Sequence, residues 1–302
     1  MDLHGSTFVL AGRRLIRRLI RGVLLRGPVR AAFDWISALL VAAFLASLLL
    51  CWAPGAGIDE SEMDAGRRAD SVAALRQERA QDRSVLHVYG SLLRGLASGE
   101  LGHSSALNRP VAELLAERLP VTAALTASGL TLAWAAGLLL ALAGLPSQAL
   151  RWLPLGLISL LVAVPVAVIA LACTLAGWPA ALAMAAAVLP KVFSYADQIF
   201  QRGLGEPYRV MAKARGIGPG RLLAAHLLWP AWPELRALAA VTVPVALGAA
   251  IPVEVFTDTP GLGQLAWKAA SGRDVMLLLY LTVMLTGLTL LCGRNRPEVG
   301  RG

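Results

Sequence analysis

The sequence predicts an all-α membrane protein that crosses the bilayer about six times. Of its 302 residues, 57% are hydrophobic and only 16% are charged, and the mean hydropathy is +0.63. A soluble domain has ~45–50% apolar and ~25% charged residues, so this chain has too few polar side chains to cover its surface in water. The apolar residues also gather in runs of about 18 to 25, the length needed to cross ~30 Å of hydrocarbon.

Six apolar runs are long enough to be spans. We expect spans at about Ile36–Ala53, Val121–Leu145, Leu153–Ala176, Pro179–Phe200, Leu238–Phe256 and Val275–Cys292. The fourth run is the weakest, because Lys191 and Asp197 lie in its second half and allow its inner end to fall before Lys191. The first run is preceded by 35 residues, too many for the charged start of a signal peptide, so an uncleaved span is expected.

These spans divide the chain into segments of different kinds. We expect a basic N-terminal segment (1–30), a first transmembrane helix (31–53), an external loop (54–119), a core of five helices (120–292) and a tail (293–302). Within the core, residues 201–235 form a loop between the fourth and fifth spans. In the external loop, a polar stretch is expected to precede a helix over Val85–Leu96.

The distribution of charge predicts the orientation. The formal net charge is +9, with a pI near 10.3, and apart from Lys191 the basic residues lie outside the apolar runs. Cytoplasmic loops of membrane proteins carry an excess of Lys and Arg, which places the N-terminal segment, the 201–235 loop and the tail in the cytoplasm. Both termini are therefore expected inside. The same bias explains the high pI without a nucleic-acid partner.

No metal or cofactor site is expected. The three cysteines, Cys51, Cys173 and Cys292, have no CxxC neighbour, and the four histidines are scattered outside the apolar runs. An intramembrane serine protease needs a histidine at membrane depth, so this enzyme class is disfavoured. An ion-gradient-driven secondary transporter or channel is the alternative reading. It predicts ionisable residues at mid-membrane and inverted repeats, and the sequence gives no clear sign of either.

The most informative segment lies between the fourth and fifth spans. It reads Tyr208-Arg-Val-Met-Ala-Lys-Ala-Arg-Gly216-Ile, followed by Arg221-Leu-Leu-Ala-Ala-His226-Leu-Leu-Trp-Pro230. This pattern predicts a short helix, a break at Gly216–Gly220 and a second short helix, because glycine permits the φ values of a sharp reversal. Small and basic side chains on the first helix fit the groove of a cytoplasmic partner.

This segment resembles the coupling loop of ABC importer permeases, and in particular the dipeptide, oligopeptide and nickel branch. The family's Glu and Ile are replaced here by Val210 and His226, and its proline comes one position late, at Pro230. The resemblance implies that the coupling residues are Tyr208, Ala212, Lys213, Ala214, Arg215, Gly216, Ile217 and His226.

Further stretches resemble the same branch and extend the resemblance to roughly residues 30–290. Before the second span lie Gly99-Glu-Leu-Gly102-His-Ser, Arg109-Pro-Val111 and Glu117-Arg-Leu-Pro120-Val-Thr122. Between the fifth and sixth spans lie Glu254-Val-Phe256, Thr259-Pro-Gly-Leu-Gly263 and Arg273-Asp274. The long basic N-terminal segment and the tail depart from the branch.

The resemblance implies the type I ABC importer permease fold in a bacterial inner membrane. The chain would be the permease subunit of an ATP-driven, binding-protein-dependent importer for peptides or a related small solute, such as a nickel or metal chelate. Its partners would be a second homologous permease, two cytoplasmic ABC ATPase subunits, an extracytoplasmic solute-binding protein and the lipid bilayer. The chain itself is expected not to be an enzyme. None of its three lysines lies in a Gly-Lys-Ser/Thr phosphate loop, so ATP and Mg are expected on the ATPase subunits.

Two further features concern the spans themselves. Glu254, at the outer end of the fifth span, is a candidate gate residue, because acids within spans are often functional. The competing reading is a solvated or hydrogen-bonded carboxylate at the mouth of the pathway. Small residues along the second span predict close helix packing: Ala124, Ser128, Gly129, Ala133 and Gly137.

Overall fold

The computed structural model describes residues 35–49, 51–52, 85–145, 148–203, 210–212, 214–216, 218 and 227–293. Within these ranges the chain is helical apart from short connections, and the only extended pairing is an isolated bridge between His103 and Pro110. The all-α prediction is therefore confirmed. The basic segment 1–30 and nearly all of the tail lie outside the described residues, as do parts of the external and coupling loops.

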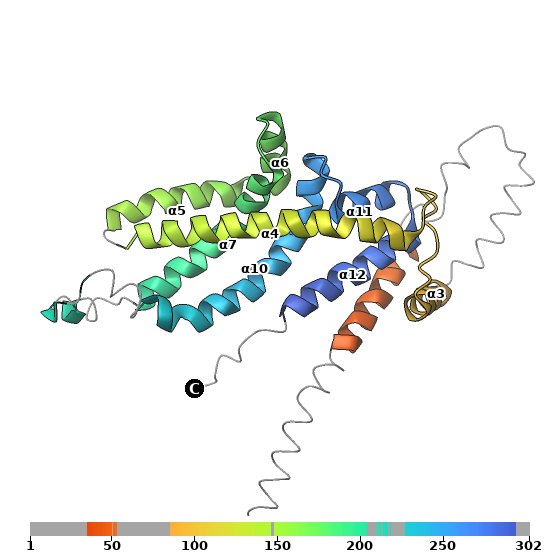
Figure 1. The fold of residues 1–302 in the computed structure, drawn as a ribbon, viewed down its shortest axis with the longest axis horizontal. Helices are drawn as coiled ribbons and strands as arrows, with labels where there is room; N and C mark the ends of the chain where they lie inside the picture. Colours follow the sequence, from red (N-terminus) through yellow and green to blue (C-terminus); the bar gives the residue numbers. More distant parts are fainter. Residues whose placement is uncertain are drawn as a thin grey trace, which may run out of the picture.

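Helices occupy all six of the predicted apolar runs. In the part of the chain that the structure describes, three helices are long and apolar enough to cross a membrane: α4 (Val111–Ala143), α7 (Ala180–Gly203) and α10 (Trp229–Phe256). The first and last runs form shorter apolar helices, Trp35–Leu49 and α12 (Val275–Gly293). The third run forms a pair of helices, α5 (Gln148–Ala163) and α6 (Val166–Leu175). Figure 1 shows these helices side by side, with α6 turned away from α5.

The third span is broken, so the single helix predicted over Leu153–Ala176 is wrong. The two helices are bent by 99° at a short break. Val164 still donates its N–H to the carbonyl of Leu160, at 3.2 Å. Pro165 has no N–H and moves to φ −58° and ψ 139°, which ends α5 and starts α6. Proline also disfavours helical geometry in the residue before it, which explains the position of the break.

Two spans begin earlier than the apolar runs predicted. Helix α4 starts at Val111 and α10 at Trp229, whereas the runs predicted Val121 and Leu238. Prolines and charges interrupt the apolar pattern there without ending the helix. At 33 residues, α4 is ~50 Å long and exceeds the ~30 Å hydrocarbon layer. Its charged first turns therefore extend beyond the apolar part of the bundle.

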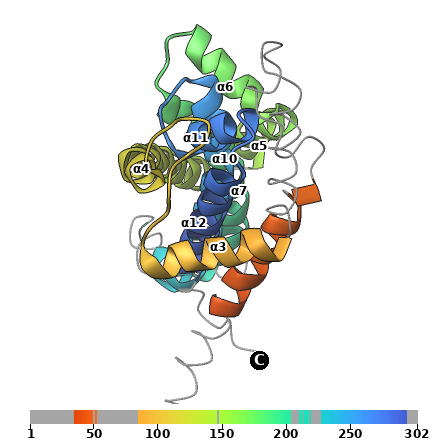
Figure 2. The same ribbon diagram turned by 90° about the vertical axis from the view of Figure 1, so that its right-hand side faces the viewer.

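Two shorter helices lie outside the predicted spans. Helix α3 (Val85–Ser98) confirms the helix predicted over Val85–Leu96, and Figure 2 shows it lying across α12 and the N-terminal helix. The Tyr89 hydroxyl donates to the carbonyl of Leu40 at 3.4 Å, and its ring meets Phe44 edge to face. Helix α11 (Leu262–Ser271) lies between the fifth and sixth predicted spans, where the sequence predicted no helix.

Among the described helices, α4 and α7 pack against each other most extensively. Gly129 faces Met184, and a Cβ added at Gly137 would lie 2.7 Å from Cγ1 of Val192. Ala133 between them is fully buried. These three positions confirm the predicted packing stripe, because small residues let two backbones approach closely. Ala124 and Ser128 lie on the exposed side of α4, so the prediction was wrong for packing within this chain.

Candidate functional site

The described part of the coupling loop is a short helix that ends at a glycine. Ala212 is only 4% exposed, whereas Ala214 and Arg215 are exposed. The Arg215 N–H donates to the Met211 carbonyl at 3.1 Å, and Gly216 follows with φ +68°. A left-handed glycine after the last helical residue is a common helix end. The other coupling residues, Tyr208, Lys213, Ile217 and His226, lie outside the described residues.

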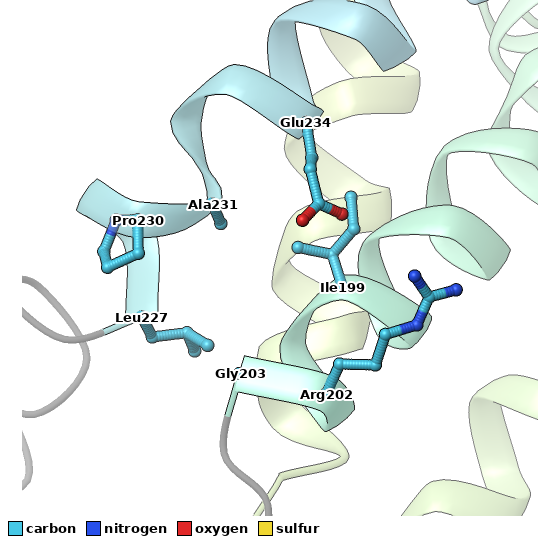
Figure 3. A pocket seen from close by; sticks show the side chains of 7 residues that line it. All are labelled: Ile199, Arg202, Gly203, Leu227, Pro230, Ala231 and Glu234. Atoms are coloured by element: carbon cyan, nitrogen blue, oxygen red, sulfur yellow. The ribbon is translucent and has the colours of Figure 1, made fainter. Parts of the chain in front are cut away.

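The helices on either side of this loop meet at its base. The end of α7 and the start of α10 enclose an open pocket of about 220 Å³, which we call the coupling-loop pocket. Its lining residues are Ile199, Arg202, Gly203, Leu227, Pro230, Ala231 and Glu234 (Figure 3). Leu227 is 2% exposed and lies against Gly203, where an added Cβ would be 3.0 Å from its Cδ1. This contact holds the end of α7, where the chain enters the loop, against the start of α10, where the loop ends.

At the other end of α10, Glu254 is fully buried and holds the start of α11. Its Oε1 accepts a hydrogen bond from the Thr122 hydroxyl at 2.7 Å. Its Oε2 accepts the backbone N–H groups of Gly263 and Gln264 at 2.6 and 3.2 Å. Thr122 in turn accepts the N–H of Leu262 at 2.7 Å. A carboxylate at a helix N-terminus satisfies N–H groups that have no partner within the helix, so Glu254 joins α4, α10 and α11.

Two glycines permit this arrangement, which we call the Glu254 anchor: Glu254, Thr122 and the first residues of α11. A Cβ added at Gly261 would meet the Glu254 carboxylate itself. A Cβ added at Gly263 would lie 2.6 Å from the Cα of Ile251, in the backbone of α10. The sequence pattern Thr259-Pro-Gly-Leu-Gly263 is thus explained by close backbone approach.

A second buried carboxylate, Asp274, joins the loop before α4 to the start of α12. Asp274 Oδ2 accepts the Ser104 hydroxyl at 2.6 Å, and Oδ1 accepts the N–H of Leu277 at 3.0 Å. Ser104 and Asp274 are 1% and 2% exposed. Asp274 thus caps α12, and it brings the Gly102-His-Ser motif against the Arg273-Asp274 motif.

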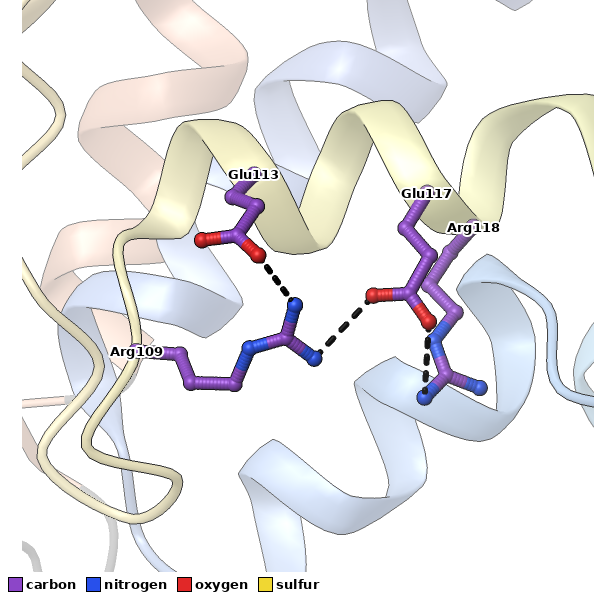
Figure 4. A network of polar contacts seen from close by, with 4 residues as sticks. All are labelled: Arg109, Glu113, Glu117 and Arg118. Atoms are coloured by element: carbon purple, nitrogen blue, oxygen red, sulfur yellow. Dashed lines mark hydrogen bonds and ion pairs between the residues drawn. The ribbon is translucent and has the colours of Figure 1, made fainter.

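Charged side chains pair on the protruding first turns of α4 (Figure 4). Arg109 contacts Glu113 at 2.5 Å and Glu117 at 3.0 Å, and Arg118 lies 3.9 Å from Glu117. Hydrogen bonding to Glu113, followed by that to Glu117, raises the pKa of Arg109 above its usual value. The pairs are half-exposed, so they orient the loop entering α4 and add little stability.

Sequence reasoning missed a pairing between α5 and α7. Arg151 forms an ion pair with Asp197, whose side chain is 5% exposed. Gln201 also donates to Asp197, at 3.4 Å. Asp197 had been noted only as a charge that weakened the fourth span. An acid inside an apolar run often pairs with a cation, and Arg151 in the short link before the third span was the available signal.

Comparison with known proteins identifies the class that this helical bundle represents. Residues 129–293 match the model of the family described as the binding-protein-dependent transport system inner membrane component. This is more than half of the chain, and the chain belongs to this family. It is an ABC importer permease, a multi-pass component of the inner membrane. Family membership excludes the alternative reading as an ion-gradient-driven transporter or channel.

Several curated relatives match nearly the whole chain. The oligopeptide transport system permease protein OppB of Salmonella typhimurium is 27% identical over 293 residues, covering 88% of this chain and 93% of the relative. The glutathione transport system permease protein GsiC of Pectobacterium atrosepticum is 26% identical, covering 82% and 87%. A Brucella suis protein, whose assignment as a peptide transport system permease is itself inferred, is 26% identical and covers 80% and 85%.

Proposed function

We propose that this permease carries peptides or peptide-like solutes inward and that ATPase subunits drive it through the Ala212–Gly216 helix. The names of the relatives, which specify peptides, oligopeptides and glutathione, support the solute class. The observation that supports coupling of this loop to transport is the extent of α10. This single helix begins at the coupling-loop pocket and ends with Glu254 holding α11.

The proposed assembly contains a second permease, two cytoplasmic ABC ATPase subunits and an extracytoplasmic solute-binding protein. ATP and Mg would be bound by the ATPase subunits, and both termini of this chain would be cytoplasmic. Exposed tryptophans near the ends of the helices support a bilayer between those ends, since tryptophan favours the membrane interface. Trp152 and Trp229 lie at the proposed inner end, and Trp178 and Trp267 at the outer end.

In the proposed mechanism, movement at the cytoplasmic end of the permease is transmitted to its outer end through connected helices. ATPase closure displaces the Ala212–Gly216 segment, and the chain on either side of it passes the displacement to α7 and α10, which meet at the coupling-loop pocket. Helix α10 then moves as a lever ~42 Å long. Because Glu254 binds the start of α11, that helix follows the outer end of α10. In this proposal α11 acts as the gate, and Glu254 attaches it to α10.

Substituting Gly216 tests the driving role. Gly216 has φ +68°, so a Gly216→Val variant would have to leave the left-handed region and redirect the loop. In the full complex in proteoliposomes, we expect peptide uptake to fall at least tenfold while the permease still inserts. Gly218→Ala is the matched control, because Gly218 is exposed and an added Cβ meets nothing within 4 Å. Unchanged uptake in Gly216→Val would refute the coupling role.

Competition experiments test the solute class. Unlabelled di- to pentapeptides and glutathione are added in excess to the complete system with its binding protein, while uptake of a labelled peptide is followed. We expect at least one peptide class to compete and a nickel chelate to have no effect. Competition by the nickel chelate alone would contradict the peptide assignment.

A further inference from the structure

The Arg151–Asp197 ion pair joins two helices near the inner end of the bundle. Asp197 lies on α7 less than two turns before its last described residue, Gly203, where the chain enters the coupling loop. Arg151 lies in the first turns of α5. The Arg151 side chain is 30% exposed and that of Asp197 only 5%, so the carboxylate depends on Arg151 and Gln201 for its partners.

Other charges near Asp197 on α7 point elsewhere. Lys191 lies over the ring of Tyr195, at 5.4 Å from the ring centre. Arg202 donates to Gln198 at 3.4 Å, on the exposed side of the helix. From the neighbouring α5, Arg151 is the cation that faces Asp197. The pair is thus a specific connection between two helices and not one contact within a diffuse charged surface.

Stability alone does not explain an ion pair whose carboxylate is buried and whose cation is partly buried. Desolvation offsets most of its attraction, and apolar side chains of similar size are often as stable or more stable in such a place. A charged, hydrogen-bonded pair is directional, whereas an apolar contact is not. It therefore forms in only one register of the two helices. The pair joins α7, which leads into the coupling loop, to α5, which leads through the Pro165 break into α6.

We propose that Arg151 and Asp197 are positioning residues that lock the start of α5 to the end of α7. When the coupling loop moves α7, α5 is carried with it, and the movement passes through the break to α6. Helix α6 packs on α7 and α10 at the other end of the bundle. Movement of the coupling loop thus reaches that end by a second route besides α10. This inference rests on the proposed function.

Three variants separate positioning from simple stabilisation: Asp197→Asn, the apolar double variant Arg151→Met/Asp197→Leu, and the charge swap Arg151→Asp/Asp197→Arg. Each is assembled with its partner subunits in proteoliposomes, and peptide uptake is measured per ATP hydrolysed. We expect Asp197→Asn and the apolar double variant to lower this ratio at least fivefold with ATPase activity retained. The charge swap should restore at least half of it. Gln198→Ala, on the exposed side of the same helix, is the control and should not change it.

The outcomes are distinct from those of the coupling-loop test. If the apolar double variant inserts and keeps its uptake per ATP within twofold of the parent, the pair only fills space and the inference is overturned. The inference is also overturned if the charge-swap variant inserts but its uptake per ATP is as low as that of Asp197→Asn. Pairing of the two charges would then not be what couples the helices. If Gly216→Val abolishes uptake while none of the pair variants alters the ratio, this inference fails and the proposed function stands.

Discussion

A hydrogen bond of 2.7 Å joins the hydroxyl of Thr122 to the carboxylate of Glu254, which lies 132 residues further along the chain. The same hydroxyl accepts the N–H of Leu262, and the same carboxylate accepts the next two N–H groups of α11. These bonds attach a helix that is only 10 residues long to two much longer spans. Since so short a helix is marginal by itself, its position depends on the Glu254 anchor.

Removing the Glu254 carboxylate should therefore release α11. In Glu254→Ala, the N–H groups of Gly263 and Gln264 lose their acceptor, and each unsatisfied buried group costs ~1–3 kcal/mol. We expect the solubilised protein to unfold at a lower temperature and peptide uptake to fall sharply. Glu254→Gln keeps one acceptor oxygen and should be affected less. If Glu254→Ala were as stable and as active as the parent, the anchor would have no role.

Gly263, in the Glu254 anchor, should not tolerate a larger side chain. At Gly263 an added Cβ meets the backbone of Ile251, which cannot move without shifting α10. Overpacking of this kind costs ~1–3 kcal/mol, so Gly263→Ala should lower the unfolding temperature. Gly248→Ala is the matched control in α10, because an added Cβ there meets nothing within 4 Å. Equal unfolding temperatures for the two variants would contradict the close approach.

The second buried carboxylate gives a prediction about the start of α12. Asp274→Ala removes both the cap of α12 and the acceptor for Ser104, whereas Ser104→Ala removes only the second of these. Loss of a helix cap costs ~0.5–2 kcal/mol, so Asp274→Ala should be the more destabilised variant in thermal unfolding. Asp274→Asn should be milder, because asparagine also caps helices. A Ser104→Ala variant that unfolds earlier than Asp274→Ala would contradict this order.

The sequence predicted what depends on local pattern. The six apolar runs and the helix over Val85–Leu96 could be read from composition along the chain, and the resemblance predicted the family. The break at Pro165 was missed because the apolar run continues through the proline. Helix α11 was missed because its burial against α10 depends on Gly261 and Gly263, which resemble loop residues in isolation.

Pairings between distant residues could not be predicted from one sequence. Glu254 was recognised as unusual, but its partners Thr122 and Gly263 come from other elements and follow only from the fold. The Arg151–Asp197 ion pair was also missed, although the charges of both residues stand out in the sequence. By contrast, Gly216 was predicted as a helix break from its residue type alone, and its φ of +68° confirms that reading.

The α4–α7 contact can be tested by asking whether a smaller residue on α7 compensates for a larger residue on α4. A Cβ added at Gly137 would lie 2.7 Å from Cγ1 of Val192, which is fully buried and branched at Cβ. Such a side chain has little rotamer freedom, so Gly137→Ala should be destabilised by ~1–3 kcal/mol. Val192→Ala creates space at the same place. The double variant should therefore unfold at a higher temperature than the sum of the two single changes predicts, because the residues are in contact. Additive effects in a double-mutant cycle would show that Gly137 and Val192 do not meet, and the packing of α4 on α7 would then differ from the one described.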